Sequence, residues 1–213
     1  MDKYLLYVAY GSNLNLAQMK RRCPMAEVYG AGRIQNYRLA FKTMGTYAYA
    51  TIEPCAGENV PVAVWRLGRR DEASLDRYEG YPIHYVKRTV EVVLEDGAVV
   101  EGMVYVMNDM SSYALPTLGY LECILEGYGS FRFDVHKLYE AWHRAGADSG
   151  QCILKHYREQ RGITQVQLAE MTGIPVKSIR KYESGERSIQ RAGAGYVLRL
   201  ARALGASPYL LAY

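Results

Sequence analysis

The sequence has few cysteines and no long apolar run, which argues against a disulfide-rich protein, a zinc protein and a membrane-spanning protein. Its four cysteines are Cys23, Cys55, Cys123 and Cys152. They lack CxxC spacing, so the sequence predicts neither a zinc site nor a disulfide framework. No stretch reaches the roughly 18 apolar residues of a membrane span, and the apolar stretch near the start ends in polar residues without a cleavage site. We therefore expect a soluble, cytoplasmic protein with reduced thiols and no membrane partner.

Internal repeats and low-complexity tracts are also absent, and what is present fits a folded chain. With 213 residues, 49% of them hydrophobic and 23% charged, the length suits one medium domain and one small domain. Residues 1–149 hold 16 Lys and Arg against 18 Asp and Glu, whereas residues 150–213 hold 10 against 4. The last part is therefore basic, which favours contact with nucleic acid, although solvated helical faces are also often basic.

The order of the expected elements in residues 1–145 predicts an α+β fold. Apolar patterns and turn residues indicate strands at 4–10, 33–41, 48–53, 60–67, 86–94 and 99–107. Helices are expected at 16–22, 71–78, 117–126 and 134–144, with Asn15 as the cap of the first. Short strands with few helices predict a small mixed β-barrel with flanking helices.

A glycine-containing segment, Gly-Ala-Asp-Ser-Gly at 146–150, is the best linker candidate in the chain. It divides the barrel from an all-α part. We predict a first domain at 1–145, a linker at 146–151 and a second domain at 152–213.

The first expected strand ends in the motif Tyr10-Gly11-Ser12-Asn13-Leu14. Glycine at this point lets the backbone approach a ligand, and consecutive N–H groups can form a nest that holds an anion or an oxyanion. A strand end that needs only a turn uses the same residue types. The motif alone thus allows either interpretation.

A second motif, Tyr78-Glu79-Gly80-Tyr81-Pro82, precedes Tyr85 and an alternating strand. Together with the first motif and Tyr120-Leu121, it resembles the gamma-glutamylcyclotransferase, or AIG2-like, family over about residues 1–143. In that family the free α-amine of a γ-glutamyl compound attacks its own γ-carbonyl, expels an amine and closes 5-oxoproline. The resemblance implies an enzyme for a small γ-glutamyl substrate that needs no protein nucleophile, metal or cofactor.

Within this resemblance, Glu79 is the expected catalytic residue, a general base that takes a proton from the α-ammonium and returns it to the leaving amine. A pocket shielded by Tyr78, Tyr81 and Tyr85 would raise its pKa by desolvation. Considered alone, Glu79 is better explained as an ordinary capping or turn acid before Gly80, and only its pairing with residues 10–14 favours catalysis.

The resemblance also assigns substrate-binding roles. The backbone N–H groups of residues 11–13 would hold the γ-carbonyl oxygen or the α-carboxylate, while Tyr10 and Leu14 would frame the cavity. Tyr120 matches a tyrosine that follows a loop in the family, and a packing role at a helix start would explain it as well.

The last part of the chain contains the block Thr164-Gln165-x-x-Leu168-Ala169-x-x-x-Gly173-Ile174. Thr164 is a helix cap, Gly173 permits a left-handed turn, and Leu168, Ile174 and Ile179 are expected to form the core between two helices. A further helix follows at 198–205. This pattern is similar to the helix-turn-helix of the phage Cro/cI-repressor class over nearly all of residues 152–213.

By this resemblance Gln165 would touch the phosphate backbone of duplex DNA. The residues expected to face the major groove are Val176, Lys177, Ser178 and Lys181. Modules of this class usually bind as dimers, which makes a homodimer possible. Polar residues are common where this chain has Pro175 and Val176, so the base preference stays open, and a helix bundle used only for dimer or protein contacts is the alternative.

Two functions follow from the sequence. The first is an enzyme that cyclises γ-glutamyl amines or peptides and carries a sequence-specific DNA-binding module. The second is a transcriptional regulator whose barrel only senses a small γ-glutamyl-type ligand. Formation of 5-oxoproline separates the two.

Overall fold

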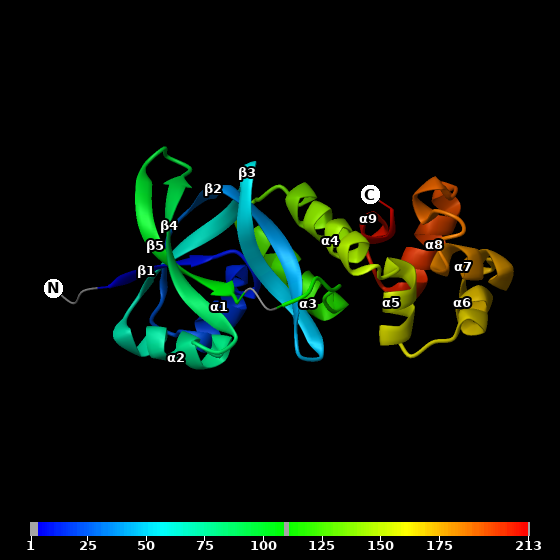
Figure 1. Ribbon diagram of the computed structural model, residues 1–213, viewed down its shortest axis with the longest axis horizontal. Coiled ribbons are helices and arrows are strands. Elements are labelled where there is room, and N and C mark those ends of the chain that lie inside the picture. The colour runs from blue at the N-terminus through cyan, green and yellow to red at the C-terminus, as the bar shows by residue number, and fades with distance from the viewer. Residues whose placement is uncertain (1–3, 109–110, 213) are drawn as a thin grey trace.

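A computed structural model describes residues 4–108 and 111–212 of the chain. Figure 1 shows two parts of the molecule, a β-barrel with flanking helices and a cluster of short helices. Helix α4 (His136–Ser149) lies between them. The sequence prediction of a barrel followed by an all-α part is confirmed.

Five strands close the barrel in the order β1-β3-β2-β4-β5. Their bounds are Leu5–Ala9, Glu27–Met44, Tyr47–Leu67, Tyr85–Leu94 and Val99–Met107 for β1 to β5. Strand β1 pairs antiparallel with β3 and parallel with β5, and the remaining pairs are antiparallel. The barrel is therefore mixed, as predicted.

The strands predicted at 48–53 and 60–67 form one long strand, β3, which is a correction to the sequence analysis. Strand β3 pairs with β2 along almost its whole length, and the register shifts between Gln35 and Tyr37, opposite Pro54 and Asn59. Residues 55–58 of β3 thus lie opposite the single residue Asn36 of β2, and the pairing continues on both sides of this irregularity. Separate apolar runs in the sequence thus belong to one bent ribbon.

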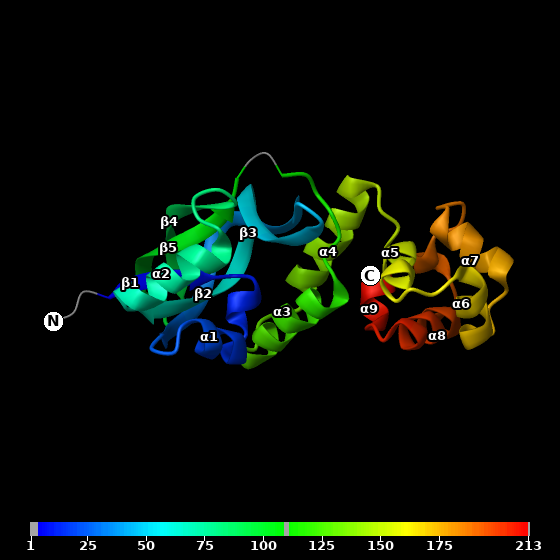
Figure 2. The same ribbon diagram turned by 90° about the horizontal axis from the view of Figure 1, so that it is seen from below.

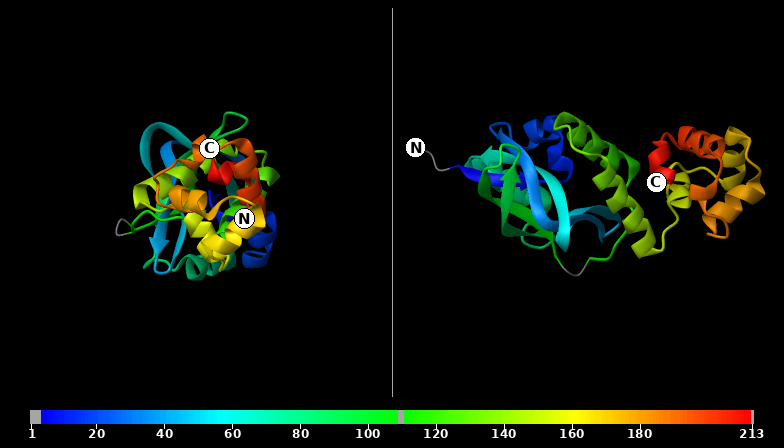
Figure 3. Two further views of the ribbon diagram at one scale, coloured as in Figure 1. Left: turned by 90° about the vertical axis from the view of Figure 1, so that its right-hand side faces the viewer. Right: turned by 90° about the horizontal axis from the view of Figure 1, so that it is seen from above.

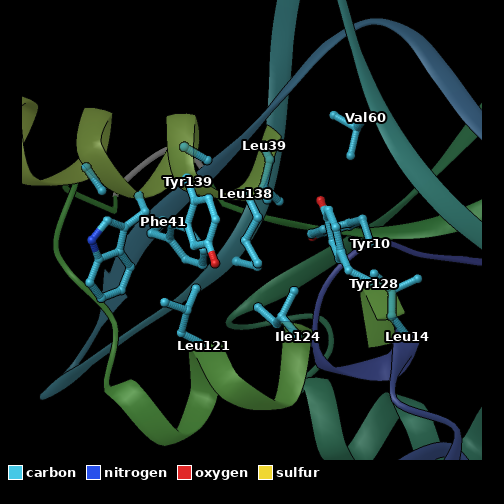
Figure 4. Close-up of a cluster of buried hydrophobic side chains, with 14 of the residues drawn as sticks. Tyr10, Leu14, Leu39, Phe41, Val60, Leu121, Ile124, Tyr128, Leu138 and Tyr139 are labelled. Carbon is cyan, nitrogen blue, oxygen red and sulfur yellow. The ribbon is translucent and has the colours of Figure 1, made fainter. Parts of the chain in front are cut away.

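Helices α3 (Leu118–Ser130) and α4 pack on the barrel and extend beyond their predicted ends. Figure 4 shows buried side chains of both helices meeting side chains of β2. The labelled members are Leu121, Ile124 and Tyr128 from α3, Leu138 and Tyr139 from α4, and Leu39 and Phe41 from β2. This cluster fixes α3 against the barrel end that carries the motif at residues 10–14.

The all-α part consists of short helices. They are α5 (Ile153–Gln160), α6 (Gln165–Thr172), α7 (Val176–Glu183), α8 (Ala194–Leu204) and α9 (Pro208–Leu211), with a 3-10 turn at Ile189–Arg191. Thr164 and Gln167 form a capping box at the start of α6, and Gly173 ends this helix with a φ of 63°. Leu168, Ile174 and Ile179 are almost fully buried, which confirms the predicted core.

The connection between the two parts is short and packed. Residues 146–149 of the predicted linker form the last turn of α4, and only residues 150–152 separate α4 from α5. The rings of Trp142 and Tyr157 stack at 4.9 Å with an interplanar angle of 2°, and both are fully buried. Tyr139 stacks on Tyr209 of α9, which lies beside α4 (Figures 2 and 3). The division at 146–151 stays a prediction, but the two parts share a core.

The four cysteines are free thiols, with Cys23 and Cys123 buried. Across residues 4–108 and 111–212, no helix combines the length and the apolarity needed to cross a bilayer.

Gly127 of α3 allows a close approach that positions the motif at residues 10–14. A Cβ at this residue would lie 2.5 Å from Leu14 Cβ and 3.0 Å from the backbone nitrogen of Asn15, whereas a Cβ at Gly129 would meet nothing within 4 Å. We therefore expect Gly127→Ala to destabilise the protein by about 1–3 kcal/mol. Gly129→Ala, the matched control in the same helix, should be neutral or stabilising because alanine favours a helix. Urea unfolding midpoints measure both, and equal midpoints would contradict the close approach.

Candidate functional site

A small pocket opens at the barrel end where β1 stops. Together with the open solvent at its mouth, the pocket has roughly 300 Å³ of empty space. Its lining combines the motif at residues 10–13, one carboxylate and five tyrosines: Tyr7, Tyr10, Gly11, Ser12, Asn13, Ala50, Glu79, Tyr85, Tyr105 and Tyr120. Segments that are far apart in the sequence thus converge on one cavity.

Glu79 is the last residue of helix α2 (Arg69–Glu79), which ends because Gly80 adopts a left-handed conformation with a φ of 64°. This ending turns the carboxylate into the pocket. Asn13 Nδ2 donates a hydrogen bond of 2.9 Å to Glu79 Oε1 and another of 2.7 Å to the hydroxyl of Tyr7. The two sequence motifs therefore meet directly.

The pocket makes Glu79 a base suited to neutral pH. Burial raises the pKa of Glu79 to about 7, and the positive charge of Arg22 and the hydrogen bond from Asn13 oppose this rise. The predicted direction is right, but the shielding is different, since Tyr78 and Tyr81 are exposed and only Tyr85 of the three lines the pocket.

Arg22, which the sequence analysis did not single out, reaches the site from the last turn of α1 (Leu16–Arg22). Its guanidinium donates to Ser12 Oγ at 3.1 Å and to Asn13 Oδ1, and it lies 3.6 Å from the centre of the Tyr78 ring. Because Oδ1 of Asn13 accepts from Arg22, the amide nitrogen of Asn13 must face Glu79. Arg22 thus orients the amide that contacts the base.

Residues Ser12–Leu14 form a single 3-10 turn. The N–H groups of Leu14 and Asn15 donate to Gly11 and Ser12 at 2.9 and 3.1 Å. Within the described part of the chain, the N–H groups of Ser12 and Asn13 have no such acceptor. They are therefore available to a ligand oxygen.

Leu14 does not frame the pocket, in contrast to the sequence prediction. Its side chain is fully buried in the cluster with Ile124 and Tyr128 (Figure 4), where Gly127 leaves room for it. The apolar residue of the motif therefore belongs to the core, while Ser12 and Asn13 line the pocket.

The five tyrosines of the pocket fall into two groups by their hydrogen bonds. The hydroxyl of Tyr10 donates to the carbonyl oxygen of Tyr105 at 2.6 Å. The hydroxyl of Tyr85 donates to the carbonyl oxygen of Ala50 at 2.9 Å, and that of Tyr105 donates to Asp76 Oδ1 at 2.6 Å. These three rings are thereby fixed as walls.

Tyr7 and Tyr120 use their hydroxyl oxygens as acceptors instead. The hydroxyl of Tyr7 accepts from Asn13, and that of Tyr120 accepts from the N–H of Ala50 at 3.1 Å. Among residues 4–108 and 111–212, no acceptor takes the proton of either hydroxyl. Both protons can therefore be donated to a ligand.

A second candidate site lies on helices α6 and α7. None of the five residues predicted to contact DNA is buried. The side chain of Gln165 is held by its neighbours, since it donates to Glu183 Oε2 at 2.8 Å and accepts from Arg180 at 3.4 Å. Lys181 forms an ion pair of 2.7 Å with Glu186, whereas Lys177 is exposed. Arg180, also exposed on α7, was missed by the sequence analysis.

An internal ion pair holds this second site together. Arg158 of α5 donates to both oxygens of Glu183 at 2.7 and 2.9 Å, and both side chains are buried. A buried charge pair fixes geometry when its hydrogen bonds are satisfied. Helices α5 and α7 are therefore rigidly linked, and Gln165 is attached to the same carboxylate.

Comparison with known proteins finds a family for each of the two parts of the chain. The model of the family "Gamma-glutamyl cyclotransferase, AIG2-like" matches residues 7–122, and a helix-turn-helix family model matches residues 154–211. The chain is 32% identical to a gamma-glutamylcyclotransferase of Homo sapiens over 134 residues, which is 59% of this chain and 71% of that protein. A gamma-glutamylcyclotransferase of Bos taurus is 34% identical over 115 residues, 50% of this chain and 61% of that protein.

Solved structures show the same similarity in the barrel. A gamma-glutamyl cyclotransferase structure superposes with a TM-score of 0.59 at 27% identity, over 68% of this chain and 88% of that one. The fold of YkqA from Bacillus subtilis is also similar, with a TM-score of 0.58 at 15% identity over 68% of this chain and 55% of that one. Because the first family model covers more than half of the sequence, this chain belongs to the gamma-glutamyl cyclotransferase, AIG2-like family and carries a helix-turn-helix domain after its barrel.

Proposed function

We propose that the barrel cyclises a γ-glutamyl amine or peptide to 5-oxoproline and releases the amine. The observation that carries this proposal is the Glu79 carboxylate, whose pKa is raised to about 7 and which faces the Ser12–Leu14 turn across a small pocket. Intramolecular attack needs a folded substrate, a base and an oxyanion site. The lining residues offer each of these.

The proposed reaction begins when Glu79 takes a proton from the α-ammonium of the substrate. The freed amine attacks the γ-carbonyl carbon, forming the ring C–N bond and an oxyanion. In this proposal the N–H groups of Ser12 and Asn13 stabilise this charge, and the support for it is that neither has a backbone acceptor in the described part of the chain. The oxyanion then collapses and the original C–N bond breaks. Glu79 passes the two protons that the α-ammonium loses, one after the other, to the departing nitrogen, which leaves as an ammonium group.

The hydroxyls of Tyr7 and Tyr120 have a defined part in this proposal. Each retains a proton and faces the pocket, so each can donate to the substrate's carboxylate or carbonyl oxygen. Burial raises the pKa of Tyr7 and that of Tyr120 above the usual value, which keeps both hydroxyls protonated. They act as donors and not as bases.

We further propose that the helix-turn-helix domain binds duplex DNA, with α7 in the major groove and two copies on half-sites about 34 Å apart. A second candidate function, a regulator whose barrel binds a γ-glutamyl ligand without turnover, is favoured by the stacking of Trp142 on Tyr157 across the two parts. If the barrel binds a γ-glutamyl compound but releases no 5-oxoproline from it, the second function is the correct one.

Glu79→Gln should lower kcat by at least about 10²-fold, because the amide keeps the size and hydrogen bonding of the side chain but cannot take a proton. Release of 5-oxoproline from γ-glutamyl dipeptides measures this. Glu122→Gln on the exposed surface of α3 is the matched control and should retain full activity. A folded Glu79→Gln variant with wild-type kcat would remove Glu79 from the mechanism.

The pH profile should follow the titration of Glu79. Only the ionised carboxylate can accept a proton, so kcat/KM should fall as the pH drops through about 7. Since Arg22 lowers this pKa, Arg22→Gln should move the acidic limb to higher pH, while Arg21→Gln, its exposed neighbour, should not. Identical limbs in wild type and Arg22→Gln would exclude the proposed charge effect.

DNA binding should weaken steeply with salt, because binding releases counterions from the phosphates. Lys177→Ala should change the base preference more than Gln165→Ala, since Gln165 is tied to Glu183 whereas Lys177 is exposed. Fluorescence anisotropy with a selected duplex pool measures both, and Lys20→Ala on the barrel is the control. Binding that is absent at low salt, or independent of salt, would argue for a protein-contact module.

A further inference from the structure

The helix-turn-helix domain and the connection that joins it to α4 both contact the segment that leads into α3. The backbone N–H of Leu115 donates to Gln151 Oε1 at 2.8 Å, and that of Leu118 donates to Gln160 Oε1 at 3.3 Å. His156 Nε2 lies 3.1 Å from the carbonyl oxygen of Pro116. Three side chains that follow α4 thus reach one short barrel segment, residues 115–118.

These contacts satisfy backbone groups that the barrel itself leaves open. Leu118 is the first residue of α3, and the first N–H groups of a helix have no partner within it. Thr117 caps the N–H of Tyr120 at 3.3 Å, and Gln160 accepts from Leu118. The start of α3 is therefore capped jointly by its own threonine and by a glutamine of the other domain.

The capped first turn of α3 contains Tyr120, which lines the pocket. Tyr120 lies in the first turn of α3, its hydroxyl accepts from the N–H of Ala50, and its ring meets Tyr49 edge-on at 5.2 Å. A shift of residues 115–118 must therefore move the Tyr120 hydroxyl relative to Glu79.

We propose that Gln151 and Gln160 are positioning residues for the barrel's active site, acting through Tyr120. The helix-turn-helix domain is then a structural part of the catalytic pocket as well as a DNA-binding module. This inference rests on the proposed cyclisation only for its effect on turnover, since the capping of residues 115–118 is independent of the reaction.

The shared core gives this arrangement its stiffness. Helix α5 is fixed to α4 by the Trp142–Tyr157 stack and to α7 by the Arg158–Glu183 pair. A displacement of α7 is thereby transmitted to α5 and to the residues that cap α3. Coupling between the domains runs through packed helices and not through rotation about a loose linker.

The double variant Gln151→Ala/Gln160→Ala tests the proposal in the full-length protein. Lys155→Ala, which is exposed on α5 like Gln160, is the matched control. Gln151→Glu/Gln160→Glu keeps both acceptor oxygens and is the rescue variant. Amide hydrogen exchange of residues 115–120 and steady-state kinetics with a γ-glutamyl dipeptide are measured for all four proteins.

In the alanine double variant we expect exchange at residues 115–120 to accelerate about tenfold and KM to rise about tenfold, with kcat changing less. The glutamate pair should return both values to within about twofold of wild type, and Lys155→Ala should change neither. Exchange in β4 and β5 should stay constant, because the effect is local.

Unchanged exchange and kinetics in the alanine double variant would overturn the proposal, and so would an equal acceleration throughout the barrel. If the wild type itself releases no 5-oxoproline, the proposed reaction fails. The exchange measurement then still decides whether the second domain positions the segment that carries Tyr120.

Discussion

The candidate site depends on one constraint, which is that a carboxylate is withdrawn from water beside a turn whose N–H groups have no acceptor in the described part of the chain. Glu79 reaches this position because Gly80 ends α2, and Asn13 reaches it because β1 stops at the barrel end. Withdrawal from water raises the pKa of Glu79 to about 7, while Arg22 limits the rise. The placement of the carboxylate, its raised pKa and the exposure of the N–H groups of Ser12 and Asn13 to the pocket all follow from how the strands and helices meet at this end.

The second domain forms hydrogen bonds to the barrel domain close to the pocket. Its helix α5 caps the start of α3 through Gln160, and the α4–α5 connection accepts from Leu115 through Gln151. A ligand in the barrel and DNA on α7 would thus act on opposite ends of one set of packed helices. If they influence one another, the influence must be reciprocal in free energy.

Signals that depend on adjacent residues were read correctly from the sequence. Asn15 and Thr164 cap their helices. The sequence did not identify Arg22 or Tyr105, because barrel closure and helix packing bring them to the pocket from other elements. Long-range packing also explains the burial of Leu14, since a glycine more than a hundred residues away leaves room for it. Adjacent residues thus predict the caps and turns, whereas closure of the barrel decides which distant residues meet in the pocket.

The most direct test of this account is the titration of the Glu79 carboxyl itself. Protein labelled with ¹³C at the glutamate carboxyl carbons can be followed by NMR against pH, and the resonance missing from Glu79→Gln identifies the residue. The account predicts a midpoint at about 7 in the ligand-free protein. A midpoint near the ordinary value of 4.5 would show a solvated surface acid and would contradict the poised base on which the proposed chemistry depends.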